Sequence, residues 1–136
     1  IKTKQKNFRM PLVKIETIKG HDREFLQTLM NSTMDSIRDV LMLPANDRNI
    51  RLIEYERDLF VMKKPYQYII EITLFSGRST NTKKALYKNI VRVLEEKYAV
   101  KKEEVFIVLN EQPLENWGLR GRKSASEINL DFKVDI

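Results

Sequence analysis

The pair Met10–Pro11 is the first place in the sequence where chemistry is possible. In a chain that begins at Pro11, this residue carries a free secondary amine on a rigid ring. Apolar surroundings and a nearby guanidinium both disfavour the ammonium form, so they would lower the pKa of this amine toward neutrality. An amine that titrates near the working pH is suited to moving a proton between carbon and oxygen.

Two further residues are candidates for binding a small anionic substrate. Arg78 stands in SGRS (76–79), at the start of a predicted helix, where a guanidinium can grip a carboxylate with two parallel hydrogen bonds. Unpaired N–H groups of the first helical turn would add to this anion site. Trp117, the single tryptophan, stands in ENWG (115–118) and would exclude water from the site.

Ordinary structural roles are also open to these residues. Pro11 can be a strand-edge proline, Arg78 a surface residue at a helix start, and Trp117 a side chain that packs over a core or a subunit interface. Residues 1–9 precede Met10, and an internal proline has its lone pair delocalised into the amide, so it is no base. The extension at 1–10 has three explanations: an artefact of start-site assignment or cloning, a segment cleaved in the cell, or a sign of lost activity.

The composition favours one folded domain at residues 11–136. A chain of 136 residues with 42% apolar residues can bury a core, and without cysteine it has no disulfide or thiolate chemistry. No membrane span or secretory leader is visible, so a cytoplasmic protein is expected. Four of the positive charges behind the net charge of +6 lie in residues 1–9, which leaves 6 − 4 = +2. A nucleic-acid interface is therefore not expected.

A duplication organises the elements that must position the candidate residues. Sliding the sequence against itself brings Gly20 onto Gly77, an offset of 57 residues (77 − 20 = 57). Repeated units that follow each other usually share one core, so repeat one is predicted at 11–62 and repeat two at 66–121, with a tail at 122–136. The same offset, without a gap, aligns Ile15 with Ile72, Leu29 with Leu86, Ile50 with Ile107 and Phe60 with Trp117.

Each copy has the pattern of a β-α-β unit. Apolar periodicity predicts strands at 12–18, 49–55, 66–75 and 104–111, and helices at Arg23–Met42 and Thr80–Tyr98, capped by Asp22 and Ser79. The predicted fold class is α/β, as an α+β two-layer sandwich with a four-stranded sheet and both helices on one face. Residues 113–122 are predicted to form a short hairpin, and the alternating residues after Ser124 an edge strand or a contact with a neighbouring subunit.

Together, MPLVKI (10–15), the duplication, LFSGRS (74–79) and ENWG resemble the tautomerase superfamily, the group of 4-oxalocrotonate tautomerase and its fused, double-length relatives. The resemblance covers Pro11 to about Gly121. It implies that the initiator methionine is removed and that the amine of the first proline is the catalytic base or acid. It also implies a trimer, since fused members assemble in this way.

The resemblance carries over to three positions. Pro11 matches the amino-terminal proline of the family, Arg78 the arginine that holds a substrate carboxylate, and Trp117 an aromatic wall of the short enzymes. The two copies have diverged, because Tyr68 stands at the proline position of the second copy and His21 at the arginine position of the first. One chain therefore keeps a single copy of the proline and arginine pair that the family uses.

The sequence also departs from the pattern of the family. The short enzymes use another arginine on the strand after the helix, but the matching positions here are Asn49 and Phe106, with Arg48 and Arg51 close by. Some fused dehalogenases carry an arginine three residues before the one in the GR pair, and Phe75 stands there. This departure weakens a dehalogenase assignment.

The predicted function is keto–enol isomerisation of a small 2-oxo or 2-hydroxy-dienoic acid, with Pro11 as base and acid and with Arg78 and Trp117 binding the substrate. Neither a metal nor an organic cofactor is expected, because His21 is the single histidine and has no second ligand at metal spacing. Expected partners are a small anionic substrate and two further copies in a homotrimer. The alternatives are a catalytically silent scaffold of the same fold and a hydratase- or dehalogenase-like fused relative.

Overall fold

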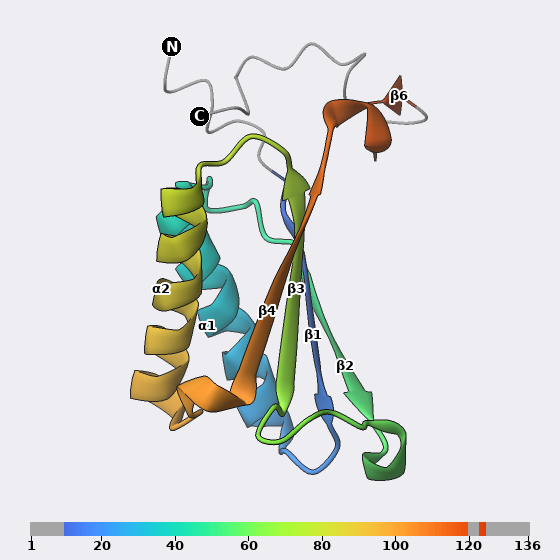
Figure 1. The fold of residues 1–136 in the computed structure, drawn as a ribbon, viewed down its shortest axis with the longest axis vertical. Coiled ribbons are helices and arrows are strands. Elements are labelled where there is room, and N and C mark those ends of the chain that lie inside the picture. Colours follow the sequence, from blue (N-terminus) through green and yellow to red (C-terminus); the bar gives the residue numbers. More distant parts are fainter. Residues whose placement is uncertain (1–9, 120–122, 125–136) are drawn as a thin grey trace.

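A four-stranded sheet with two helices on one face forms the body of the molecule (Figure 1). The computed structural model describes residues 10–119 and 123–124. The sheet order is β2-β1-β3-β4. Its elements are β1 (Leu12–Ile18), α1 (Arg23–Leu41), β2 (Ile50–Tyr55), β3 (Tyr68–Phe75), α2 (Thr80–Tyr98) and β4 (Val105–Gln112). The predicted two-layer fold built from tandem β-α-β units is confirmed.

The strand registers repeat from one copy to the next. Ile15 of β1 pairs in parallel with Leu52 of β2, and Ile72 of β3 pairs in parallel with Leu109 of β4. Each residue of the second pair stands 57 positions after its counterpart in the first pair. The duplication seen in the sequence is therefore a duplication of backbone geometry as well.

An approximate two-fold axis relates the two copies. They join through antiparallel pairing of β1 with β3, in which Lys14 lies opposite Glu71, its own equivalent (71 − 14 = 57). The side chains of this pair also meet, with Lys14 Nζ 3.9 Å from Glu71 Oε1. Because two equivalent residues face each other across the seam, the axis passes between them. Each feature at one end of the sheet thus has a counterpart at the other end.

The two helices begin and end at equivalent residues. Asp22 caps α1 by accepting a hydrogen bond from a backbone N–H, and Ser79 caps α2 in the same way, as predicted. Both helices end at a residue in the left-handed conformation, Met42 after α1 and Ala99 after α2. The two helices have the same length of 19 residues, and they begin at residues that are 57 positions apart.

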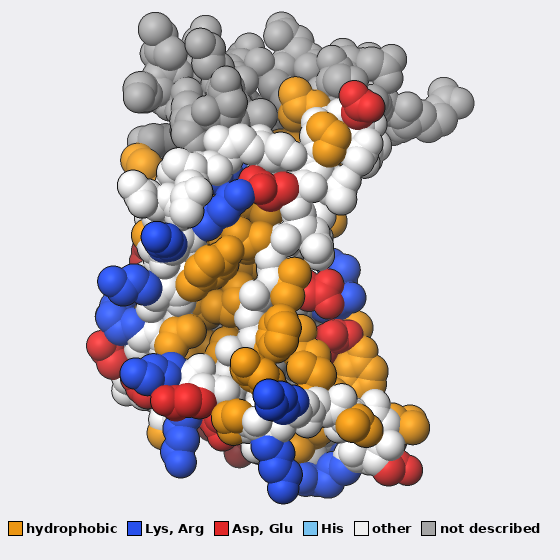
Figure 2. Space-filling view, in the orientation of Figure 1, with side chains coloured by type: hydrophobic (Ala, Val, Ile, Leu, Met, Phe, Trp, Pro, Cys, Tyr) orange, Lys and Arg blue, Asp and Glu red, His pale blue; other side chains and the backbone are white. Residues whose placement is uncertain are grey.

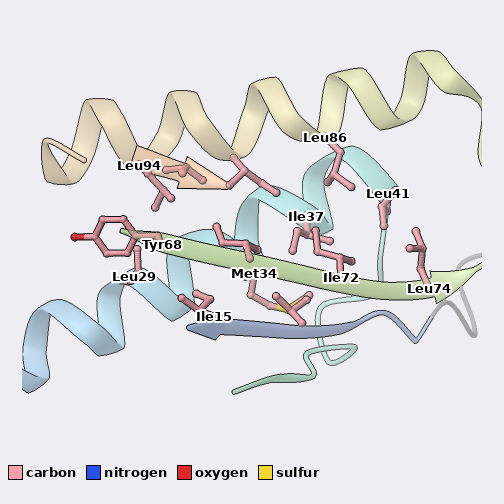
Figure 3. Packing of buried hydrophobic residues seen from close by; sticks show 14 of the residues in the cluster. Ile15, Leu29, Met34, Ile37, Leu41, Tyr68, Ile72, Leu74, Leu86 and Leu94 are labelled. Carbon is pink, nitrogen blue, oxygen red and sulfur yellow. The ribbon is translucent and has the colours of Figure 1, made fainter. Parts of the chain in front are cut away.

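The core lies between the sheet and the helices (Figure 3). Side chains from α1, α2, β1 and β3 point into this layer, and Met34 fills the space beside the central strands without any exposed surface. The labelled core residues are Ile15, Leu29, Met34, Ile37, Leu41, Tyr68, Ile72, Leu74, Leu86 and Leu94. Such a shared layer explains why neither copy needs a core of its own.

The sheet face away from the helices carries apolar side chains that remain accessible. Leu12, Ile53 and Phe106 are 37%, 39% and 38% exposed, and each alternates along its strand with residues of the core. Figure 2 shows hydrophobic side chains at the surface along the sheet, with charged side chains around them.

The tail begins with a short hairpin. A 3-10 turn, η4 (Leu114–Asn116), leads to β5 (Gly118–Leu119), which pairs antiparallel with β6 (Lys123–Ser124). The hairpin predicted at 113–122 is thus present but extends to Ser124. The predicted edge strand after Ser124 and residues 1–9 of the predicted extension at 1–10 lie outside the described residues. Among the helices of the described ranges, none has the length and apolar character needed to cross a membrane.

Equivalent core positions should contribute equally to stability. Leu29 and Leu86 are 0% and 1% exposed. We expect Leu29→Ala and Leu86→Ala each to lower the free energy of unfolding by about 2–5 kcal/mol, because each leaves a cavity in the shared layer. Leu59→Ala, at a residue 70% exposed, should change it by less than about 0.5 kcal/mol. Urea denaturation measures these values, and a large cost at only one of the two buried positions would contradict a shared core.

Candidate active site

The start of β1 meets the end of β3 at one end of the sheet (Figure 1). Pro11 is buried directly before β1. Leu12 pairs with Thr73, so the antiparallel register brings Met10 beside Phe75, the last residue of β3. Met10 indeed packs against the buried pair of Phe75 and Trp117. The proline is thereby held at an edge where three segments of the chain come together: the β1 start, the β3 end and the tail.

Trp117 lies in an apolar group that closes this end of the sheet. Its ring meets the ring of Phe75 edge to face, with centroids 4.7 Å apart, and it is 7% exposed while Phe75 is 0% exposed. The indole Nε1 donates a hydrogen bond to the backbone carbonyl of Gln112 at 3.3 Å. We call this group the Trp117 cluster; its members are Phe75, Trp117, Met10, Leu114 and Leu119.

Arg78 is buried at the same end, between β3 and α2. Its side chain is 7% exposed, and its Nη1 donates a hydrogen bond to the backbone carbonyl of Phe75 at 3.0 Å. The turn that leads to it uses Gly77 at φ +124, a left-handed conformation that glycine adopts without strain. Ser79, the N-cap of α2, follows directly, so the guanidinium lies close to the start of that helix.

The three residues predicted from the sequence therefore lie at one end of the sheet, around Phe75. Met10, next to Pro11, packs against the pair of Phe75 and Trp117, Arg78 donates a hydrogen bond to the Phe75 carbonyl, and the Trp117 ring meets the Phe75 ring. A buried guanidinium at the same end of the sheet as the proline would favour the neutral form of a free amine there. The apolar rings beside it reduce the access of water.

Asp47 is a residue of this end that the sequence analysis missed. Its Oδ2 accepts a hydrogen bond from the backbone N–H of Met10 at 3.0 Å, and its Oδ1 accepts one from Asn49 Nδ2 at the same distance. The backbone of Asn49 also accepts a hydrogen bond from the N–H of Val13. Asp47 stands in the turn after α1, where acidic residues are common, so no local pattern signals its contact with the β1 start.

The arginines near the second family position are placed elsewhere. Arg48 Nη1 binds Asp35 Oδ1 of α1 at 2.7 Å. Arg51 is exposed on the edge strand β2, and Asn49, at the matching position, donates its amide to Asp47. Arg48 is thus engaged with α1, whereas Arg78 binds the Trp117 cluster through the Phe75 carbonyl.

The opposite end of the sheet holds the diverged counterparts. Tyr68, at the proline position, is 5% exposed, and His21, at the arginine position, lies with its ring centroid 5.8 Å from the ring of Tyr68. His21 also stacks on Phe25 at 4.8 Å. Burial raises the pKa of the Tyr68 hydroxyl, and the Glu104 carboxylate raises it further. Aromatic packing thus replaces the proline and arginine at this end.

In the described parts of the chain, no three His, Cys, Asp or Glu residues are grouped so that they could hold a metal ion.

Comparison with known proteins shows the family of this chain. Residues 47–120, more than half of the chain, match the sequence model of a family described as "Tautomerase enzyme". This chain belongs to the tautomerase family. Probable tautomerase YusQ of Bacillus subtilis (strain 168) is 30% identical to it over 116 residues, which cover 79% of this chain and 91% of that protein.

Solved structures share the fold of this tautomerase-family chain. FG41 malonate semialdehyde decarboxylase, inhibited by 3-bromopropiolate, superposes with a TM-score of 0.74 at 24% identity, over 85% of this chain and 92% of that chain. A fused 4-OT described as a wild-type symmetric trimer superposes with a TM-score of 0.75 at 19% identity, over 85% of this chain and 96% of that chain. At these identities the likeness shows a common fold.

The buried hydroxyl of Tyr68 predicts a loss of stability at alkaline pH. Because its pKa is raised in the folded chain, the unfolded chain releases this proton first, so stability falls as pH rises above about 10. We expect wild type to lose more unfolding free energy than Tyr68→Phe between about pH 9 and about pH 11. Urea denaturation at both pH values tests this, and equal losses in the two proteins would contradict it.

Proposed function

We propose that this protein, as a chain that begins at Pro11, is a cofactor-independent tautomerase of a small 2-oxo or 2-hydroxy-dienoic acid. The observation that carries the proposal is the convergence of Pro11, Arg78 and Trp117 around Phe75 at one end of the sheet. Membership of the tautomerase family supports it. At the opposite end, Tyr68 stands at the position that matches Pro11 and His21 at the position that matches Arg78.

The proposed reaction moves one proton. Arg78 holds the substrate carboxylate through two parallel hydrogen bonds and stabilises the dienolate charge. The neutral amine of Pro11 accepts the proton of the enol hydroxyl and then delivers it, as an ammonium, to a substrate carbon. The rings of Phe75 and Trp117 keep water away, which strengthens the electrostatic contribution of Arg78. No step of this scheme needs an electron acceptor or a second substrate.

Release of the amine requires cleavage of the Met10–Pro11 bond. In the described chain the Pro11 nitrogen belongs to that peptide bond and therefore has no basic lone pair. Cleavage would also remove the Met10 N–H from Asp47. The freed carboxylate would then stand near the new amine and orient it, opposing in part the effect of Arg78 on its pKa.

The first test uses a chain prepared with Pro11 as its first residue. We expect this chain to ketonise phenylenolpyruvate, and Pro11→Ala to lower kcat by about a hundred- to ten-thousand-fold, because the secondary amine is lost. Arg78→Ala should lower kcat/KM by about ten- to a hundred-fold through the lost carboxylate contact. The rate is measured as the loss of the ultraviolet absorbance of the enol form of phenylenolpyruvate.

Matched variants distinguish chemistry from folding in this test. Arg51→Ala, which removes an exposed arginine of β2, should leave the rate unchanged, and Arg78→Lys should keep part of the affinity. Circular dichroism reports whether each variant folds. Turnover that survives Pro11→Ala and Arg78→Ala at the wild-type rate would remove the tautomerase proposal.

A catalytically silent scaffold is the second candidate, and one observation favours it. Met10 is anchored by Asp47, and the buried Pro11 is continuous with the residue before it. Intact mass of protein from its own cells separates the two candidates, because a mass matching residues 11–136 supports the enzyme. A mass that retains Met10, together with an inactive trimmed chain, supports the scaffold.

We also propose that three copies assemble through the open sheet face. The accessible apolar residues Leu12, Ile53 and Phe106 support this assembly, as does the fused 4-OT of the same fold that is described as a symmetric trimer. We expect light scattering to give three times the protomer mass for wild type and a smaller species for Ile53→Glu or Phe106→Glu. Val61→Glu, at a residue 90% exposed outside the sheet, is the control. A wild-type monomer at micromolar concentration would contradict the trimer.

A further inference from the structure

The approximate two-fold axis relates the Trp117 cluster to a pocket at the opposite end of the sheet. This pocket has a volume of about 200 Å³. Its lining residues are Ile18, Arg57, Phe60, Met62, Tyr66 and Gln67. An offset of 57 residues takes Ile18 to Phe75, Arg57 to Leu114, Phe60 to Trp117 and Met62 to Leu119, and takes Met10 to Gln67. All five members of the Trp117 cluster therefore have a counterpart in the lining of this pocket.

Substitutions between the copies explain why one end is filled and the other is hollow. Ile18 and Phe60 are smaller than their counterparts in the Trp117 cluster, so they leave space that the larger rings occupy at the other end. Arg57 and Gln67 replace an apolar leucine and methionine. The duplication thus produced an apolar cluster at the Pro11 end and a pocket with a charged and an amide side chain at this end.

The guanidinium of Arg57 carries a positive charge that is not neutralised by a carboxylate of the described residues. Within the described residues it forms no ion pair within 4.0 Å and donates no hydrogen bond. The carboxylate of Glu56, the residue before Arg57, already has a partner, since Lys19 Nζ binds it at 2.6 Å. Without a partner among the described residues, the guanidinium is free to bind an anion from solution.

Gly20 allows the guanidinium of Arg57 to lie against the backbone. A Cβ built at Gly20 would stand 3.1 Å from Arg57 Nη2, and Gly20 has φ +129. Gly20, in the turn after β1, therefore also leaves space for the guanidinium of Arg57. The same turn at the other end of the sheet precedes Arg78, so each end places one guanidinium near its glycine turn, though from different sequence positions.

Gln67 offers a second polar group to a ligand. Its backbone N–H donates to the carbonyl of Glu104, and its carbonyl accepts a hydrogen bond from Thr17 Oγ1 at 2.8 Å. Because its backbone is engaged in this way, Gln67 can offer only its side-chain amide to a ligand in the pocket that it lines. Phe60 and Met62 supply apolar surface beside it.

We propose that this pocket, the Arg57 pocket, binds a small carboxylate with an apolar body. A guanidinium fork matches the two oxygens of a carboxylate, and the side chains of Phe60 and Met62 suit a short hydrocarbon or a single ring. The volume is below the range of about 300–1,000 Å³ typical of sites for drug-sized ligands, which limits the ligand to a small acid. The pocket uses neither Pro11 nor Arg78, so this inference does not depend on the proposed catalytic activity.

Benzoate is the probe, and the methyl group of Met62 is the reporter. In NMR titrations of the full chain, benzoate should shift the Met62 methyl signal in a saturable manner. Arg57→Leu introduces the residue that stands at the equivalent position of the second copy, Leu114, so the fold should tolerate it. We expect this variant to weaken binding by about ten- to a hundred-fold, because a charged hydrogen-bonding partner is lost. Arg57→Lys should retain part of the affinity.

Controls make the result decisive. Arg92→Leu removes a guanidinium from α2 without touching the pocket and should leave the benzoate titration unchanged. The indole signal of Trp117 reports separately on binding at the Pro11 end. A Met62 signal that does not move, or that moves equally in wild type and Arg57→Leu, would overturn the proposal. Binding of inorganic phosphate but not of benzoate would also overturn it, because the ligand class would then be wrong.

Discussion

The antiparallel pairing of β1 with β3 is the constraint on which the rest of the structure depends. It joins two β-α-β units across an axis between Lys14 and Glu71, and it lets both helices pack on one face over a common core. Because the strands run in opposite directions, the start of β1 lies beside the end of β3. Pro11 and Arg78, far apart in the sequence, are therefore near the same residue, Phe75. A parallel seam would have placed them at opposite ends of the sheet.

Symmetry of the backbone contrasts with asymmetry of the two ends. The helix bounds, caps and glycine turns repeat at the same offset, because they are set by local geometry that both copies need. The side chains at the strand ends are under no such requirement, so they have diverged. One end combines a buried proline and arginine with an apolar cluster, whereas the other combines Tyr68 and His21 with the Arg57 pocket. Duplication in this family member thus supplied two equivalent positions that now have different chemical character.

Local patterns predicted the fold well but did not predict every contact at the Pro11 end of the sheet. Apolar periodicity and the residues Asp22 and Ser79 predicted both helices to within a residue at each end, since caps and amphipathic spacing act over one or two turns. The strands β2 and β3 begin one and two residues later than predicted, because strand ends depend on a pairing partner that local pattern does not contain. The hairpin of the tail likewise extends beyond its predicted end to reach Ser124. The contact of Asp47 with the Met10 N–H could not be predicted, because it joins a turn to a segment 37 residues away.

By itself, the sequence determined the duplication, the element order, the resemblance to tautomerases and the identity of Pro11, Arg78 and Trp117 as candidates. These follow from residue types and spacings that can be read along the chain. Only the tertiary structure decided that the three candidates share one end, that Phe75 is the residue on which they converge, and that the other end is hollow. The physical reason is that these properties depend on how side chains from different segments fit together in volume and charge. Such segments meet only across the pairing of β1 with β3 and at the ends of the strands. Whether Arg57 has a carboxylate partner, for example, depends on where Lys19 and Glu56 lie in space.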